Sequence, residues 1–185
     1  MMKPVNKPKV RRPRLRQPRA ERSVAEEPAR PTTILVPTDF SYAADRALHH
    51  AVRLARRFRA RIALLHVVAP AGFPEVLIPA LRVDLPQLVA LSRERLDRLV
   101  RRFRIRPSYQ AVKTGHAAGE ILEFADEAGA DLIVMGARGH GALKRAVIGN
   151  TAERVVRLAR CPVMIVPLPP ASKQKREEQA GNINR

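Results

Sequence analysis

Four glycines and three cationic side chains lie within one stretch of sixteen residues, Gly136–Thr151. Glycine has no Cβ, so its backbone can approach a ligand closely. Gly149 comes directly before Asn150 and Thr151, at the expected start of a helix, where free N–H groups and the helix dipole favour an anion. The stretch therefore predicts a phosphate cradle, with a plain strand-to-helix loop as the alternative. A β-branched residue at position 149 is expected to point at the phosphates and to oppose the local backbone geometry.

Two familiar phosphate motifs do not fit this stretch. A Walker A loop starting at Gly136 would have Ala142 and Leu143 in place of its Lys and Ser/Thr. A dinucleotide fingerprint starting at Gly139 would have Lys144 at its last glycine. No nucleophile–base pair accompanies the glycines in the sequence. We therefore expect binding and not catalysis, although slow hydrolysis of bound ATP is compatible with this expectation.

A carboxylate, Asp39, follows an apolar run near the start of the chain. It could accept hydrogen bonds from the hydroxyl groups of a ribose. It could also cap the helix that follows. The residues alone leave both roles open.

The surrounding elements alternate between strands and helices. Ser41 can cap the first helix, Asp84 and Pro86 open the second, and Gly129 is well placed to end the third. Continuous apolar strands joined by helices predict a single doubly wound α/β domain with a parallel sheet. If the first and fourth strands are neighbours, Asp39 and Gly136 face one crevice at the carboxyl ends of the strands. The expected strands are Thr32–Val36, Arg61–Val68, Tyr109–Lys113, Asp131–Met135 and Val163–Val166.

Composition fits one intracellular domain. With 185 residues, 45% of them hydrophobic and no tryptophan, the chain can bury an aliphatic core. No apolar run approaches the ~20 residues of a membrane helix, and no secretory signal pattern opens the sequence. The single cysteine, Cys161, fits a reducing compartment. We predict a cytoplasmic protein without membrane insertion.

The formal charge of +18 is spread unevenly. Residues 1–30 hold ten Lys or Arg and three Glu, and residues 171–185 add a balance of +2, which leaves +9 for the middle. We predict a disordered basic tail at 1–31, a domain at 32–170 and a polar tail at 171–185. The basic tail is either solvating or an arm for nucleic acid. The arginine run of the second helix, Arg93–Arg104, is interpreted as a solvated face.

In combination, these segments resemble the universal stress protein family, in its ATP-binding branch. Gly136, Gly139 and Gly149 match the spacing of its G-2x-G-9x-G loop. The similarity runs from about Thr32 to Pro167, outside both tails. It also covers the segments Ile34–Ser41, Leu64–Val68, Asp131–Gly136, Asn150–Val156 and Cys161–Val166.

The resemblance implies a sheet in the order 3-2-1-4-5 and a site for ATP, with AMP or ADP as alternatives and Mg²⁺ accompanying the phosphates. It assigns Asp39 to the ribose, and Pro37 and the backbone of Val67 to the adenine pocket. The family has Ser or Thr where this chain has Asn150, so altered phosphate contacts are expected. No catalytic or metal-binding residue is implied. The binding residues would be Pro37, Thr38, Asp39, Val67, Met135, Gly136, Ala137, Arg138, Gly139, Gly149, Asn150 and Thr151.

The implied role is regulatory, in the response to stress. The strand Val163–Val166 would be the last at its edge of the sheet, so a homodimer paired through that strand is expected. The competing hypothesis is a nucleic-acid-associated protein that binds through its basic N-terminal tail.

Overall fold

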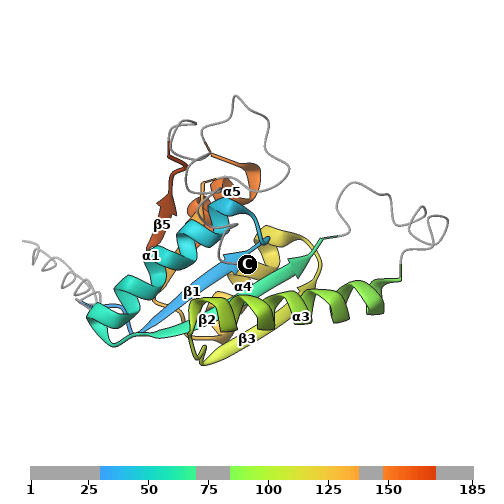
Figure 1. Cartoon of the computed structure of the whole chain (residues 1–185). Helices are drawn as coiled ribbons and strands as arrows, with labels where there is room; N and C mark the ends of the chain where they lie inside the picture. The colour runs from blue at the N-terminus through green and yellow to red at the C-terminus, as the bar shows by residue number, and fades with distance from the viewer. Residues whose placement is uncertain (1–29, 70–83, 138–147, 170–185) are drawn as a thin grey trace, which may run out of the picture.

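The five expected strands form one parallel sheet in the order β3-β2-β1-β4-β5 (Figure 1). The computed structural model describes residues 30–69, 84–137 and 148–169. The expected order is confirmed, and the observed strand ends lie within two residues of the expected ones. The strands are β1 (Thr33–Thr38), β2 (Arg61–Val68), β3 (Tyr109–Thr114), β4 (Leu132–Gly136) and β5 (Val163–Val166).

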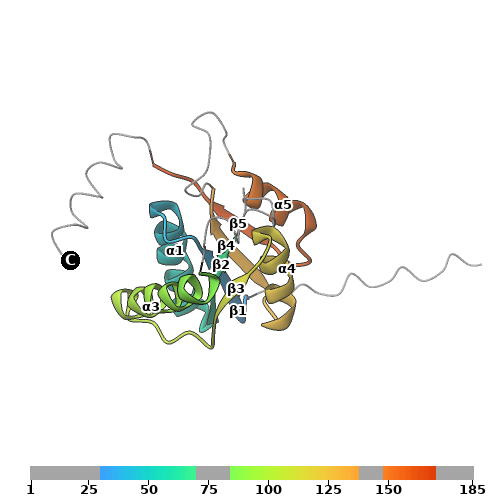
Figure 2. The same ribbon diagram turned by 90° about the vertical axis from the view of Figure 1, so that its right-hand side faces the viewer.

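Helices cover both faces of the sheet, as the doubly wound prediction requires (Figure 2). α1 (Tyr42–Phe58) and α3 (Leu85–Phe103) pack on one face, around buried Leu48, Leu64 and Leu96. α4 (Ala117–Glu127) and α5 (Asn150–Leu158) pack on the other face, where Leu35, Ile133 and Val155 are buried. The buried core is aliphatic on the α1/α3 side, and on the α4/α5 side it is aliphatic apart from Phe124.

The expected helix signals occupy their expected places. The Ser41 hydroxyl accepts a hydrogen bond from the Ala44 N–H at 3.2 Å, and Asp84 accepts one from the Gln87 N–H at 3.0 Å. Gly129 has a φ of +58°, the left-handed conformation that glycine adopts without strain just after a helix. These caps fix where each helix begins or ends, and hence which residues remain at the edge of the sheet.

Asp131 ties the start of β1 to the start of β4. Its carboxylate accepts hydrogen bonds from the Thr32 N–H at 2.8 Å and the Thr33 N–H at 3.2 Å, and from the Thr32 hydroxyl. Two strands that are 98 residues apart in sequence are thereby fixed side by side. As a result, the carboxyl ends of β1 and β4 emerge next to each other.

Several expectations fall outside the described residues. They concern most of the basic tail and the polar C-terminal tail. Where the structure does describe the chain, no helix is long and apolar enough to cross a membrane. The same residues bring together no group of three His, Cys, Asp or Glu side chains that could hold a metal ion.

Candidate functional site

The ladder between β1 and β4 stops before either strand ends. The last pair is Leu35↔Ile133, although β1 continues to Thr38 and β4 to Gly136. The Arg61 N–H donates to the Thr32 carbonyl, so even-numbered residues of β1 face β2 and odd-numbered residues face β4. Pro37 therefore faces β4 but has no N–H to donate. Strand pairing is open where the strand order reverses, the place where doubly wound sheets bind ligands.

The turn after β1 is built by Asp39 and its neighbours. The Thr38 hydroxyl accepts from the Phe40 N–H, and Asp39 Oδ1 accepts from the Ser41 N–H, each at 3.0 Å. Phe40 has a φ of +62°, an uncommon conformation for a bulky residue. Ser41, and not Asp39, caps α1. The alternative that Asp39 is the helix cap is therefore wrong, although its carboxylate does order the turn before the cap.

His66 supports this turn from β2, a role that the sequence did not suggest. Its Nδ1 lies 2.8 Å from the Thr38 carbonyl oxygen, and its ring packs 4.3 Å from the ring of Phe40. Burial lowers the pKa of His66, so the neutral ring is favoured at neutral pH. In that form Nδ1–H donates to Thr38. The guanidinium group of Arg95 lies over the ring of Phe40, 4.5 Å from its centre.

The backbone of Val67 faces the open end of β1. The Gly115 N–H donates to the Val68 carbonyl, so Val68 faces β3 and Val67 faces the β1 side. The β1–β2 ladder ends at Thr38↔His66, and its continuation would place Val67 opposite Asp39. The Phe40 N–H, which would be next to reach the Val67 carbonyl, donates to Thr38 Oγ1 instead. The Val67 carbonyl therefore faces the region that the resemblance assigns to adenine.

Gly136 is required by packing as well as by its expected role beside a ligand. A Cβ at this position would lie 2.9 Å from the backbone carbon and oxygen of Ala43, in the first turn of α1. Such a contact forces the backbone to shift. The glycine thus lets the end of β4 lie against the start of α1, close to the Asp39 turn.

The first turn of α5 is held at the end of β4. The Ala137 N–H donates to the Val166 carbonyl at 3.0 Å, and the Ala137 carbonyl accepts from the Gly149 N–H at 2.8 Å. The first hydrogen bond of the helix runs from the Glu153 N–H to the Gly149 carbonyl. The N–H groups of residues 150–152 come before it and therefore have no acceptor within the helix. Within the described residues, no side chain caps this end. Three N–H donors therefore stand where the phosphate cradle was expected.

One expectation about Gly149 is wrong. Its φ of −78° and ψ of 155° define extended backbone, which any residue can adopt. A β-branched side chain would not oppose the backbone here, so only its projection toward a ligand remains as an argument.

We define the switch-point edge as Pro37–Asp39, Val67, Gly136, Ala137 and Gly149–Thr151. All of these expected site residues lie beyond, or at, the carboxyl ends of β1, β2 and β4. The side chains of Thr38 and Met135 are each only 6% exposed, and Met135 packs into the α4/α5 core, so neither side chain is available to a ligand. Arg138 and Gly139 lie outside the described residues.

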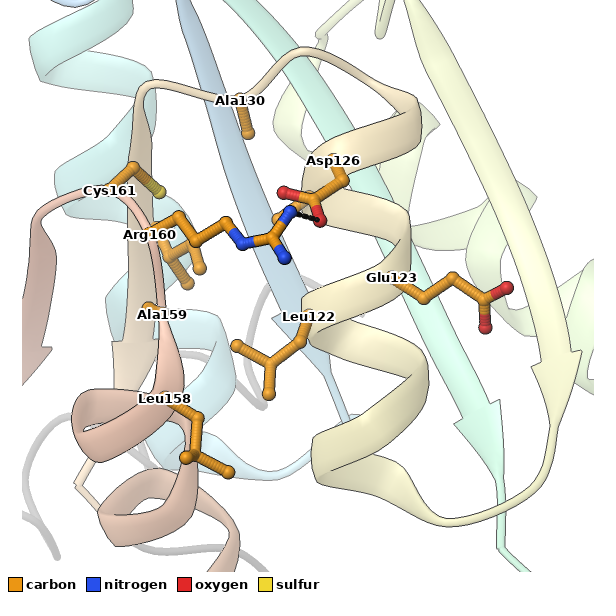
Figure 3. Close-up of a pocket in the computed structure, with 10 residues that line it drawn as sticks. Leu122, Glu123, Asp126, Ala130, Leu158, Ala159, Arg160 and Cys161 are labelled. Carbon is orange, nitrogen blue, oxygen red and sulfur yellow. Dashed lines mark hydrogen bonds and ion pairs between the residues drawn. The ribbon is translucent and has the colours of Figure 1, made fainter.

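A pocket of about 280 Å³ lies away from this edge, between α4 and the link from α5 to β5 (Figure 3). Arg160 reaches across it and binds Asp126 Oδ2 at 3.0 Å, while the Glu123 carboxylate points away from Arg160. Burial raises the pKa of the Cys161 thiol, which disfavours the reactive thiolate. No switch-point residue lines this pocket, and its arginine is already paired with a carboxylate.

The fold and the switch-point edge define a doubly wound protein of the kind that binds ligands where its strand order reverses. The family model of the universal stress protein family matches residues 31–167. The chain therefore belongs to the universal stress protein family.

Individual relatives agree with this assignment. The chain is 34% identical to universal stress protein MJ0531 of Methanocaldococcus jannaschii over 142 residues, which cover 74% of this chain and 82% of the relative. Its fold is similar to that of MJ0577 from the same organism, with a TM-score of 0.66 and 25% identity, over 76% of this chain and 98% of that one. It is also similar to a universal stress protein crystallised in complex with cAMP, with a TM-score of 0.51 and 25% identity, over 75% and 98% of the two chains.

Proposed function

We propose that this protein binds an adenine nucleotide at the switch-point edge and acts as a regulatory module in the response to stress. ATP is the proposed ligand, with AMP and ADP as alternatives. The observation that carries the proposal is the bond from Gly149 to Ala137, which fixes three N–H donors of α5 at the end of β4. We propose a cytoplasmic location, because a chain with a single cysteine fits a reducing compartment.

The order of groups along the edge follows the order of groups in a nucleotide. The Val67 carbonyl is on β2, Asp39 follows β1, and the first turn of α5 is tied to β4. Neighbouring strands are about 4.8 Å apart, so these three positions span roughly 10 Å. Adenine would bind beside Val67 and Pro37, ribose would bind at Asp39, and phosphates would bind at Asn150 and Thr151.

The proposed role is binding and not catalysis. The described part of the edge brings no nucleophile beside a general base, and Mg²⁺ would be held chiefly by the phosphates themselves. The related protein crystallised with cAMP supports an adenine nucleotide as the class of ligand. Slow hydrolysis of bound ATP is compatible with this arrangement.

Calorimetric titration of the full chain with ATP, ADP, AMP and GTP tests the proposal. We expect one adenine nucleotide bound per chain and weaker binding of GTP. Mass spectrometry of small molecules released from the purified, denatured protein provides an independent check. The absence of both a binding heat and a released adenine nucleotide would contradict the proposal.

We further propose a homodimer formed through β5. Pro162 and Val166 accept hydrogen bonds from β4, so the alternation points the N–H and C=O groups of Val163 and Ile165 away from the sheet. Within residues 30–69, 84–137 and 148–169 no further strand pairs with these groups, and Met164 beside them is 40% exposed. Antiparallel pairing with a second copy would satisfy them.

Ile165→Pro should convert the dimer to a monomer in analytical ultracentrifugation. The substitution removes an N–H that faces the open edge, whereas the bonds from β4 to Pro162 and Val166 remain. Circular dichroism should show an intact fold. A wild-type chain that sediments as a monomer at micromolar concentration would be incompatible with this interface.

A further inference from the structure

The two helical layers of the domain carry opposite charge. The α1/α3 layer, residues 42–60 and 84–107, holds twelve arginines, no lysine and four carboxylates, a balance of +8. In the α4/α5 layer, residues 115–131 and 148–162 hold three arginines and six carboxylates, a balance of −3. Of the two layers, which lie on opposite faces of the sheet (Figure 2), only the α1/α3 layer has an excess of positive charge.

The carboxylates of the α1/α3 layer are already engaged. Asp45 binds Arg102, and Glu94 lies 3.7 Å from Arg98. Asp97 accepts from the Gln110 amide at 2.6 Å, and Asp84 caps α3. Among the described arginines of this layer, nine that are exposed therefore have no carboxylate partner: Arg53, Arg56, Arg57, Arg59, Arg93, Arg95, Arg101, Arg104 and Arg106.

The end of α3 packs beside the first half of α1, and the arginines are spread over the two helices. Arg102, in the last turn of α3, binds Asp45 of α1, and the rings of Phe103 and His49 are 4.6 Å apart. Arginines in the last turn complement a helix dipole, but that dipole amounts to about half a charge per helix. Two helices account for roughly one charge, far less than +8. The remaining like charges repel one another, so a polyanion would stabilise this face.

We propose that the α1/α3 layer docks the phosphate backbone of duplex nucleic acid. All twelve cations are arginines, whose planar guanidinium groups bind phosphate oxygens in a bidentate manner. The large apolar side chains exposed on the described part of this layer are Phe58 at 37%, Leu88 at 41% and Leu91 at 53%. Phe58 is at the end of α1 whereas the two leucines are near the start of α3, so they form no continuous apolar face. A bilayer anchor needs an apolar face, and single strands need exposed aromatic rings for stacking. The 19-residue helix α3 is about 28 Å long, which matches about eight base pairs.

This surface differs from the one that the sequence suggested. The basic tail lies largely outside the described residues, whereas the arginine layer belongs to the folded domain. It flanks the switch-point edge but shares none of its residues, so nucleic-acid binding and nucleotide binding can be tested separately.

The test compares two triple variants of the full chain. One is Arg56→Gln, Arg57→Gln and Arg101→Gln on the α1/α3 layer, and the other is Arg154→Gln, Arg157→Gln and Arg160→Gln on the opposite layer. Both lower the formal charge by three and keep the tails unchanged. Binding to a random duplex of about 20 base pairs is followed by fluorescence anisotropy between about 50 and 200 mM salt.

We expect the α1/α3 variant to bind the duplex at least about tenfold more weakly, with a slope of log K against log salt reduced by about 2 to 3. The opposite variant should bind like the parent. The ATP affinity of the α1/α3 variant should stay within a few-fold of the parent, which separates this test from that of the proposed function.

If both variants lose the same amount of duplex affinity, binding depends on overall charge and the proposal is wrong. If neither variant loses duplex affinity, the tails bind the duplex and the proposal is also wrong. Vesicles containing phosphatidylserine provide the remaining arm. If the α1/α3 variant loses vesicle binding but keeps duplex binding, the face is a membrane surface and the proposal is wrong.

Discussion

Gly149→Val is expected to lower the affinity for ATP by more than about 100-fold while the domain stays folded. The backbone at Gly149 is extended, so valine fits the local conformation, and its cost as a helix cap is about 1 kcal/mol of stability. Its branched side chain would occupy the space in front of the α5 N–H groups, where the phosphates are proposed to bind. Calorimetric titration with ATP measures the loss, and circular dichroism confirms the fold.

Gly119→Val is the matched control for this variant. Gly119 lies in the first turn of α4, and a Cβ there would meet no atom within 4 Å. A β-branched residue near a helix start should thus leave ATP affinity within a few-fold of the wild type. If folded Gly149→Val also binds ATP like the wild type, the stretch after β4 is an ordinary loop and the proposed cradle is lost.

Asp39→Ala should weaken ATP binding by about 1.5–3 kcal/mol, which corresponds to roughly 10- to 150-fold. This is the expected cost of losing a charge-assisted hydrogen bond to the ribose. The substitution also removes the acceptor of the Ser41 N–H, so part of the loss could come from a disordered turn.

Asp39→Asn separates these two causes. The Asn carbonyl oxygen can still accept from the Ser41 N–H, so the turn and the thermal stability should be kept, whereas the negative charge is removed. We expect calorimetry to show weaker ATP binding for Asp39→Asn even though its thermal unfolding matches the wild type. Wild-type affinity in this variant would restrict Asp39 to a role in the turn.

The strands and helix caps could be predicted because their signals are local. Arg61–Val68 and Val163–Val166 have the same bounds in sequence and structure, since a short apolar run that is rich in β-branched residues and lies between polar or turn residues indicates a strand. Ser41 and Asp84 were found in the same way, because a cap acts on an N–H three residues away.

The parts of the site that depend on distant neighbours could not be predicted from local signals. The need for glycine at position 136 comes from Ala43, which is far away in sequence. The opening of the β1–β4 ladder follows from the direction in which Pro37 faces, which requires the register with β2. His66 could be recognised only as a buried ring until Thr38 and Phe40 were placed beside it.

The arginine layer shows the same limit. In the sequence, the arginines of α3 are a polar helix face and those of α1 are scattered cations. The charges of the two helices add up on one surface because both crossovers, from β1 to β2 and from β2 to β3, pass over the same face of the sheet. Topology therefore turns two unremarkable helices into one charged surface.

The outward-facing groups of β5 have a consequence for this surface. Antiparallel pairing of two β5 edges places the two-fold axis perpendicular to the joined sheet, so both α1/α3 layers lie on the same side. The dimer would then present two identical arginine surfaces to one long polyanion. Once one protomer is bound, the other meets its segment of the duplex at a high effective concentration, so binding would be bivalent. Dissociation of the dimer would thereby also release the nucleic acid, because each surface alone would bind only weakly.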